Sequence, residues 1–485
     1  MKRLEDLNFN NSFRSLPNEF YTPVQPACFE SASLISYNPA AFALLDLDTN
    51  EATRKEFVEY FSGQKQLSGF DPLAIAYAGH QFGHYVAQLG DGRAILLGEV
   101  INDKKEKWDL HAKGAGQTAY SRGFDGRAVL RSSIREYLAS EAMHGLGIPT
   151  TRALCLIGTG EKVIREGPEK GALIIRMAPS HIRFGNFEYF YYNKQYKELQ
   201  ILADYSIKTH YSHLVNKENK YKLFFQEIVK RTAKLIAKWM AVGFTHGVLN
   251  TDNMSIMGLT IDYGPYGFMD SFNFDFVPNH SDYSGRYSYR NQPYIGLWNL
   301  TALAKALEPL LDSQETQEVL DKYSSIYSKE YFSLMRAKMG FHTAQKSDPE
   351  MIDELLNLMH NSQVDYTIFF RKLSDLANNS VLLDQMFGCS NEWKTWLEKY
   401  TIRLTKEGIS PHDRISKMNS VNPKFILRNY IAEEAIRSAT YSENYEEIDK
   451  LLKLLSNPFA EQNEHEKYAS PPPEWSKQIC ISCSS

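Results

Sequence analysis

The chain has 485 residues, 43% of them hydrophobic, and its 54 Lys and Arg residues almost balance its 58 Asp and Glu residues. A net charge of −4 spread along the chain does not form the basic face of a nucleic-acid-binding protein. No apolar run is long enough to cross a bilayer, the N-terminus lacks a signal-peptide core, and five cysteines are too few for a disulfide scaffold. We therefore expect a cytoplasmic, monomeric protein of two or three lobes, with neither nucleic acid nor membrane as a partner.

The first part of the chain predicts an extension followed by a β-meander. Residues 1–70 contain several prolines and are expected to form loops and short helices. A strand is expected at Tyr85–Leu89, a turn at Gly90–Arg93 and a second strand at Ala94–Val100. Apolar and polar residues then alternate up to Lys113, the pattern of a third, half-buried strand. Short connections between these strands predict an antiparallel meander.

Helical patterns dominate after the meander. A helix is expected from Leu130 until the glycines and proline at 145–149, and two more strands are expected around Ala153–Ile157 and Ala172–Met177. Beyond about residue 190 the pattern is mainly helical, and Phe224–Met240 carries an apolar stripe every three or four residues.

This order predicts an α+β fold that resembles the two lobes of a protein kinase. The expected units are an N-terminal extension (1–70), a small β-rich lobe with one key helix (71–185), a larger helical lobe (186–455) and a C-terminal tail (456–485).

The polar residues follow the order of a kinase nucleotide site. Such a site needs a glycine turn near phosphate, a lysine on the third strand, a helix glutamate that holds this lysine, and an Asn and an Asp for the metal. The segment Gly90–Arg93, Lys113 and Glu136 supply the first three. Each alone is weak, because glycine turns are usually plain hairpins and most Lys and Glu residues are solvated.

The metal-binding pair is expected at Asn253 and Asp262. The residues between them read as a tight hairpin around Gly258, which would return its two ends to the same place. An amide oxygen and a carboxylate suit Mg²⁺ or Mn²⁺, which are hard ions. The alternative is an Asn cap and an Asp in a turn.

The kinase pattern fails at one position. A kinase catalytic loop carries its catalytic Asp five residues before the Asn. If Asn253 is that Asn, the Asp position is Val248, which cannot accept a proton. The chain is then either a nucleotide-binding module without catalysis or an enzyme with another base, for which Asp252 is the available carboxylate.

At these residues the sequence is similar to the selenoprotein O family, from about residue 10 to the C-terminus. The matching segments are His80–His84, Gln88–Ala94, Lys113–Thr118, Ser121–Ala128, Asn250–Asn253, Asp262–Pro265, Asn422–Pro423 and Leu427–Asn429. Phe124 stands where members usually carry glycine, whereas the Asp-Gly-Arg core that follows it is intact.

This resemblance implies a kinase fold that binds ATP reversed and transfers AMP to Ser, Thr or Tyr hydroxyls of proteins, releasing pyrophosphate. Some bacterial members use UTP and Mn²⁺, so UTP is a second candidate nucleotide and the metal is Mg²⁺ or Mn²⁺. Asp252 would be the proton acceptor, and Asn253 and Asp262 would hold the metal. The nucleotide contacts it implies are Gly90, Gly92, Arg93, Lys113, Asp125, Gly126, Arg176, Arg183 and Asp262. Arginine forks suit a pyrophosphate leaving group.

The C-terminal tail carries a candidate redox pair, Cys480 and Cys483. The resemblance implies a disulfide from this tail to the loop after the metal aspartate, but residues 265–287 contain no cysteine. A disulfide between the two tail cysteines and plain exposed thiols remain as alternatives.

Other classes compete with this interpretation. Gly114–Ala119 fits a dinucleotide fingerprint, with Glu136 as its acid, but the expected strands form no βαβ unit. His80 and His84 imitate a zinc pair, but flanking glycines disfavour the helix this requires. A regulatory pseudokinase without catalysis and a kinase with a displaced base remain open.

Overall fold

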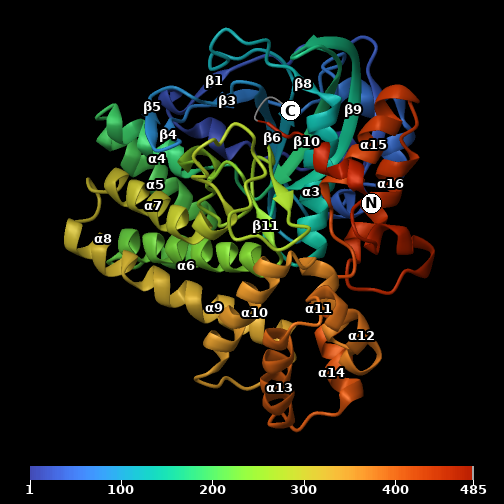
Figure 1. Cartoon of the computed structure of the whole chain (residues 1–485). Helices are drawn as coiled ribbons and strands as arrows, with labels where there is room; N and C mark the ends of the chain where they lie inside the picture. The colour runs from blue at the N-terminus through green and yellow to red at the C-terminus, as the bar shows by residue number, and fades with distance from the viewer. Residues whose placement is uncertain (483–485) are drawn as a thin grey trace.

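An antiparallel sheet forms the upper part of the molecule (Figure 1). The computed structural model describes residues 1–482. In spatial order the strands are β1 (Tyr21–Pro23), β3 (Leu73–Ile75), β6 (Ala94–Ile101), β7 (Lys107–Lys113), β10 (Pro168–Ala178), β9 (Arg152–Ile164) and β2 (Ser33–Tyr37), and β8 (Ala128–Val129) pairs with β10. The chain therefore has a β-rich part and a helical part, which is compatible with two lobes.

The register of the central strands sets up the site. On β7, Lys113 pairs with Ala94 of β6 and with Ile174 of β10, and His111 pairs with Arg176. Because side chains alternate across a strand, Lys113, His111 and Arg176 lie on one face of the sheet. The other face carries apolar residues such as Leu110 and Ala112, which belong to a core cluster with the N-terminal segments.

Two expectations for this part of the chain are wrong. The predicted strand Tyr85–Leu89 does not pair with β6: His84–Val86 (β5) forms a separate hairpin with β4 (Gly79–Gln81), and β3 takes the place beside β6. Local alternation cannot reveal which strand will be the partner. The prediction that the third strand is half-buried also fails, because Asp109 and His111 on its polar face are only 3% and 0% exposed.

Residues 1–70 contribute more than loops and short helices. β1 pairs with β3 and β2 pairs with β9, both antiparallel, so this segment supplies two strands to the sheet. It also contains α1 (Pro39–Leu44) and α2 (Lys55–Phe61).

The expected helix after the meander and the long amphipathic helix are both present, as α3 (Leu130–Gly145) and α6 (Lys220–Ala241). The two expected strands before the helical part are longer than predicted, as β9 and β10. The remaining helices are α4 (Phe184–Tyr192), α5 (Tyr196–His210), α7 (Gln292–Ala306), α8 (Ser313–Leu320), α9 (Lys322–Lys338), α10 (Asp348–Ser362), α11 (Tyr366–Leu373), α12 (Leu376–Met386), α13 (Asn391–Thr405), α14 (Pro411–Asn419), α15 (Asn429–Tyr441) and α16 (Glu446–Ser456).

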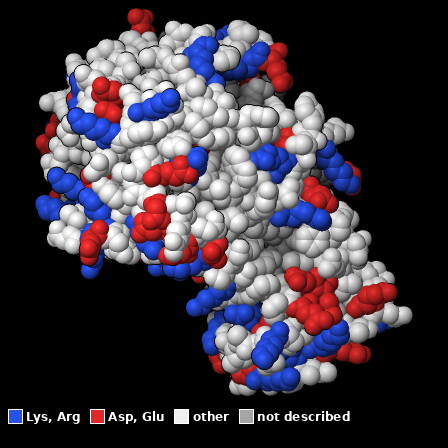
Figure 2. All heavy atoms as spheres, turned by 90° about the vertical axis from the view of Figure 1, so that its left-hand side faces the viewer, with Lys and Arg blue, Asp and Glu red and all other residues white. Residues whose placement is uncertain are grey.

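Figure 1 shows how these helices are arranged: α6 crosses the middle of the molecule, α10 to α14 form its lower end, and α15 and α16 lie against α3. Among residues 1–482, none of the helices combines the length and apolar character needed to span a membrane. Figure 2 shows basic and acidic side chains interspersed over the face turned to the viewer.

Candidate active site

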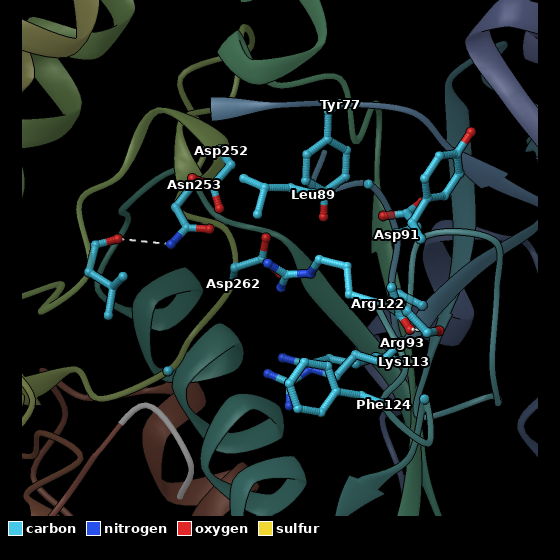
Figure 3. A pocket seen from close by; sticks show the side chains of 18 of the residues that line it. Tyr77, Leu89, Asp91, Arg93, Lys113, Arg122, Phe124, Asp252, Asn253 and Asp262 are labelled. Carbon is cyan, nitrogen blue, oxygen red and sulfur yellow. Dashed lines mark hydrogen bonds between the residues drawn. The ribbon is translucent and has the colours of Figure 1, made fainter. Parts of the chain in front are cut away.

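A pocket of about 690 Å³ opens between the sheet and the helical part. Every residue that the sequence analysis assigned to the nucleotide, the metal or the proton lines it: Gly90, Gly92, Arg93, Lys113, Asp125, Gly126, Arg176, Arg183, Asp252, Asn253 and Asp262. Figure 3 shows Asp252 and Asn253 on one side, Arg93 and Lys113 on the other, and Asp262 between them. Residues up to 172 positions apart in sequence, from Gly90 to Asp262 at the extremes of this set, thus share one cavity.

The glycine segment is held under a neighbouring loop. Gly90 has φ +64°, and a Cβ there would lie 2.3 Å from the ring of Tyr120. Thr118 donates a hydrogen bond to the main-chain oxygen of Asp91, and Ser121 donates one to that of Gly92. Glycine is therefore needed at position 90 for its backbone conformation and for this close packing. The segment does not join two paired strands, as the predicted meander required, because β5 does not pair with β6.

Lys113 forms a buried ion pair with Glu136 of α3. Burial alone would raise the pKa of Glu136, but the charges of Lys113 and Arg176 outweigh it and lower that pKa. Burial lowers the pKa of Lys113, against the opposing charge of Glu136. The neighbouring Arg135 donates to the main-chain oxygen of Tyr266 at 2.8 Å, which ties α3 to the helical part. Glu136 itself does not line the pocket and acts on it through Lys113.

Two buried arginines hold Asp262. Arg176, on β10, and Arg183, which precedes α4, each donate to one carboxylate oxygen of Asp262. These arginines and Lys113 lower the pKa of Asp262 well below its usual range, in spite of burial. Asp262 has φ +55°, a conformation that is uncommon outside glycine and often found at functional sites.

His111, which the sequence analysis did not assign, links the glycine segment to this cluster. Arg176 Nη2 lies 2.6 Å from His111 Nδ1, and His111 Nε2 lies 3.1 Å from Asp91 Oδ2. Because a guanidinium only donates, Nδ1 accepts and the ring proton lies on Nε2, directed at Asp91. Burial lowers the pKa of His111 to about 4, so the ring is neutral. The sequence did offer one signal for His111: it lies two residues before Lys113 on the same strand, and therefore on the same face of the sheet.

Asp252 differs from the other pocket carboxylates. Four aspartates line the pocket: Asp262 pairs with arginines, Asp125 with Arg165 and Asp91 with His111, whereas Asp252 forms no ion pair among the described residues. Its Oδ2 accepts from Gln81 Nε2 at 3.1 Å, and its buried Oδ1 accepts no hydrogen bond in the described part of the chain. Burial raises the pKa of Asp252 to about 7, against the hydrogen bond from Gln81. Such a group can take up a proton near neutral pH.

Asn253 and Asp262 offer oxygen atoms that fit a divalent cation. Asn253 donates Nδ2 to the main-chain oxygen of Val248 at 2.9 Å, which leaves its Oδ1 for a ligand. The expected hairpin between the two residues is reduced to a single bridge, Met254 with Thr260, around the turn at Gly258. Residues 1–482 contain no cluster of three or more His, Cys, Asp or Glu side chains able to hold a metal. Two protein oxygens suit Mg²⁺ or Mn²⁺, which usually take further ligands from phosphates and water.

The loop before α3 closes one side of the pocket. Asp125 pairs with Arg165 at 2.8 Å and accepts from the main-chain N–H of Arg127. Gly126 has φ +68°, and a Cβ there would lie 2.1 Å from the main-chain oxygen of Gly116. Phe124, the departure from the family pattern, lines the pocket with 69% of its surface exposed.

The remaining candidates lie elsewhere. His80 and His84 lie on the β4–β5 hairpin and not on a helix, so they lack the helical spacing of a zinc-binding pair. His80 pairs with Glu188. The strand that ends just before Gly114, β7, pairs antiparallel with both of its neighbours, β6 and β10, so the dinucleotide alternative lacks the adjacent parallel strands of its βαβ unit. Cys480 is exposed, and Ile481 beside it accepts a hydrogen bond from His280 N at 2.9 Å. Cys483 lies outside the described residues.

These features define a class of protein. A pocket that is lined by one lysine, six arginines and a glycine segment has the charge and the backbone to accept a ligand with several phosphate groups.

Comparisons with known proteins identify the family. A sequence profile described as "Protein adenylyltransferase SelO" matches residues 3–456, and the chain belongs to this family, which makes it an enzyme of the nucleotidyltransferase class. The chain is 49% identical over 489 residues to a protein from Myxococcus xanthus named "Protein nucleotidyltransferase YdiU", with 100% of both chains covered. Proteins of the same name from Stutzerimonas stutzeri and Pseudomonas fluorescens (strain SBW25) are 49% and 50% identical, again over 100% of both chains.

Proposed function

We propose that this enzyme transfers AMP from ATP to Ser, Thr or Tyr hydroxyls of proteins and releases pyrophosphate, with UTP as a second nucleotide. One observation carries the proposal: within residues 1–482, Asp252 is the pocket aspartate without a cationic or histidine partner, while Val248 stands where a kinase has its base. Because Asp252 lies beside the proposed metal ligand Asn253, a hydroxyl that it binds would lie close to the metal-bound phosphates.

The fold proposed to carry this chemistry is kinase-like, with a β-rich lobe at 71–185 and a helical lobe at 186–455. The buried pair of Lys113 on a sheet strand and Glu136 on the helix beside it supports this proposal, as does the loop that carries Asn253 and Asp262. The proposed nucleotide contacts are Gly90, Gly92, Arg93, Lys113, Asp125, Gly126, Arg176, Arg183 and Asp262.

In the proposed step, the acceptor hydroxyl gives its proton to the Asp252 carboxylate while its oxygen forms a bond to the α-phosphorus. The bond from the α-phosphorus to the bridging oxygen of the β-phosphate breaks, and both electrons leave with pyrophosphate. Arg93, Arg176 and Arg183 supply fixed positive charge for that leaving group. Since both arginines at Asp262 are buried and already oriented, little reorganisation is needed when charge develops.

A divalent cation, Mg²⁺ or Mn²⁺, would be held by Asn253 and Asp262 and would neutralise phosphate charge when bound. The chain's own part is to keep Asp262 ionised and oriented through Arg176 and Arg183. These two proposed roles, metal ligand for Asp262 and base for Asp252, agree with the low pKa of Asp262 and the raised pKa of Asp252. One aspartate stays charged, and the other can exchange a proton.

The test uses purified protein, Mg²⁺ or Mn²⁺, and ATP labelled at either the α- or the γ-phosphate. Label on protein from α-labelled ATP alone, with pyrophosphate as product, supports AMP transfer. Label from γ-labelled ATP alone makes the protein a kinase with a displaced base. Binding of ATP with no label from either would make it a regulatory pseudokinase.

A further inference from the structure

The β4–β5 hairpin lies along the loop that carries the proposed base. His80 N donates to Thr251 Oγ1 at 2.6 Å, Gln81 Nε2 donates to Asp252 Oδ2 at 3.1 Å, and Phe82 N lies 3.3 Å from Asn250 Oδ1. Three successive residues of one segment, His80 to Phe82, thus contact three successive residues of the other, Asn250 to Asp252. The His80–His84 motif, to which the sequence assigned no role beyond structure, is built to hold this loop.

The hairpin is anchored independently of Gln81. His80 Nδ1 pairs with Glu188 Oε1 of α4 at 2.5 Å, and Glu188 Oε2 accepts from Thr251. Glu188 is fully buried, so this bridge fixes the hairpin against both α4 and the loop. Removing the Gln81 amide would therefore leave the hairpin in place.

The turn of the hairpin is held in a strained conformation. Phe82 has φ +51°, which is rare for an aromatic residue, and Gly83 has φ +84°. Phe82 N also donates to Tyr287 Oη at 2.8 Å, and Tyr287 donates to Asn250. Strain of this kind persists where surrounding contacts enforce it, often at functional sites. Gln81, one residue before this turn, donates its side-chain amide to Asp252.

Asp252 is confined from two sides. Its Oδ2 accepts from Gln81, and a Cβ on Gly79 would lie 3.0 Å from its Oδ1, a contact so tight that a side chain at position 79 would press on the carboxylate. Gln81 and Asp252 both line the pocket. A carboxylate oxygen has more than one lone pair, so Oδ2 can accept from Gln81 and from an incoming hydroxyl together.

We infer that Gln81 is a positioning residue that orients the Asp252 carboxylate toward the acceptor hydroxyl. The inference rests on the proposed role of Asp252 as base. A neutral amide donor suits this task, because it fixes one oxygen of the carboxylate without forming an ion pair that would compete with the hydroxyl. Gln81 touches no reacting atom and acts through Asp252.

The test compares Gln81→Met, which keeps the shape but cannot donate, with the wild-type enzyme. We expect kcat for AMP transfer to fall about 10- to 100-fold, as for loss of a hydrogen bond to a charged group, with KM for ATP and the melting temperature unchanged. The matched control is Gln64→Met, an exposed glutamine whose amide donates to Phe29 O at 2.8 Å, and it should behave as wild type.

Two further experiments test whether Gln81 acts through Asp252. In an Asp252→Asn background, Gln81→Met should cause no additional loss, because it acts through the missing carboxylate. In crystals of Gln81→Met, the Asp252 carboxylate should be rotated or disordered. Unchanged kcat, an equal loss in the Asp252→Asn background, an unmoved carboxylate, or a raised KM for ATP with a lower melting temperature would each overturn the role of Gln81. Full activity of Asp252→Asn alone would instead overturn the proposed base.

Discussion

Arg183 donates from Nη1 to the main-chain oxygen of Asp252 at 2.7 Å, and the same nitrogen pairs with the carboxylate of Asp262. One buried guanidinium therefore joins the loop of the proposed base to the proposed metal ligand. The Cζ atom of Arg183 also lies 4.6 Å from the ring centroid of Tyr77, so the guanidinium packs on this ring. Arg183 thus sets the distance between the loop of Asp252 and the carboxylate of Asp262. The same arginine is a proposed contact of the pyrophosphate leaving group.

Replacing Arg183 by Lys should be a severe change although the charge is kept. An ammonium lacks the planar guanidinium, so it loses the packing on Tyr77 and the fixed direction of the nitrogen that donates to both oxygens. We expect kcat to fall at least about tenfold, as for loss of one charge-assisted hydrogen bond. Steady-state kinetics would show this, with Arg437→Lys, an exposed arginine paired with Glu433, as control. Wild-type kinetics for Arg183→Lys would contradict it.

Asp262→Asn should remove the proposed metal ligand while keeping the shape of the side chain. We expect transfer to fall at least about 100-fold and the affinity for Mn²⁺ with ATP to fall with it, since an amide binds a hard cation less well than a carboxylate. The rate and calorimetric titration measure the two effects. Asp275→Asn, an exposed aspartate paired with Arg290, is the control. Retained activity would refute the assignment.

His111 allows its two hydrogen bonds to be tested separately. Asn at this position places an acceptor near Nδ1 and can keep the bond from Arg176, whereas Gln places a donor near Nε2 and can keep the bond to Asp91. We expect His111→Gln to raise KM for ATP about tenfold by freeing Arg176, and His111→Asn to change it much less. Steady-state kinetics of both variants, together with their melting temperatures, measure the change in KM for ATP. A larger rise in KM for His111→Asn than for His111→Gln would contradict the role of His111.

Lys338 predicts a pH-dependent stability. It is 4% exposed, lies 4.3 Å from the ring centroid of Phe370, and forms no salt bridge among the described residues. Burial lowers its pKa from 10.5 to about 7. Between these two values the unfolded chain binds more protons, so this group makes the protein less stable at pH 7 than at pH 9, by up to about 2 kcal/mol.

Lys338→Met should therefore raise the free energy of unfolding at pH 7 by about 1–3 kcal/mol and flatten its rise toward pH 9. Urea denaturation at both pH values measures the change. Lys346→Met, at an exposed position, should have no such effect. An unchanged pH dependence in Lys338→Met would show that the lysine is charged in the folded protein.

Much of this protein is determined by local sequence. The stripe of α6 and the end signals of α3 predicted both helices, because burial of one side imposes a helical period whatever the partner is. The spacing of Asn253 and Asp262, and the order of the glycine segment and Lys113, predicted residues that share one pocket, and Glu136 was correctly predicted as the partner of Lys113. The missing kinase base was also visible in the sequence, as Val248.

Only the tertiary structure decided which strands pair and which polar residues are buried. The β5 strand joins a hairpin outside the main sheet, while β1 and β2 enter it from the N-terminal segment, because pairing depends on distant partners that local alternation does not encode. For the same reason His111 and Gln81 were not assigned: their roles follow from Arg176 and Asp252, which are 65 and 171 residues away.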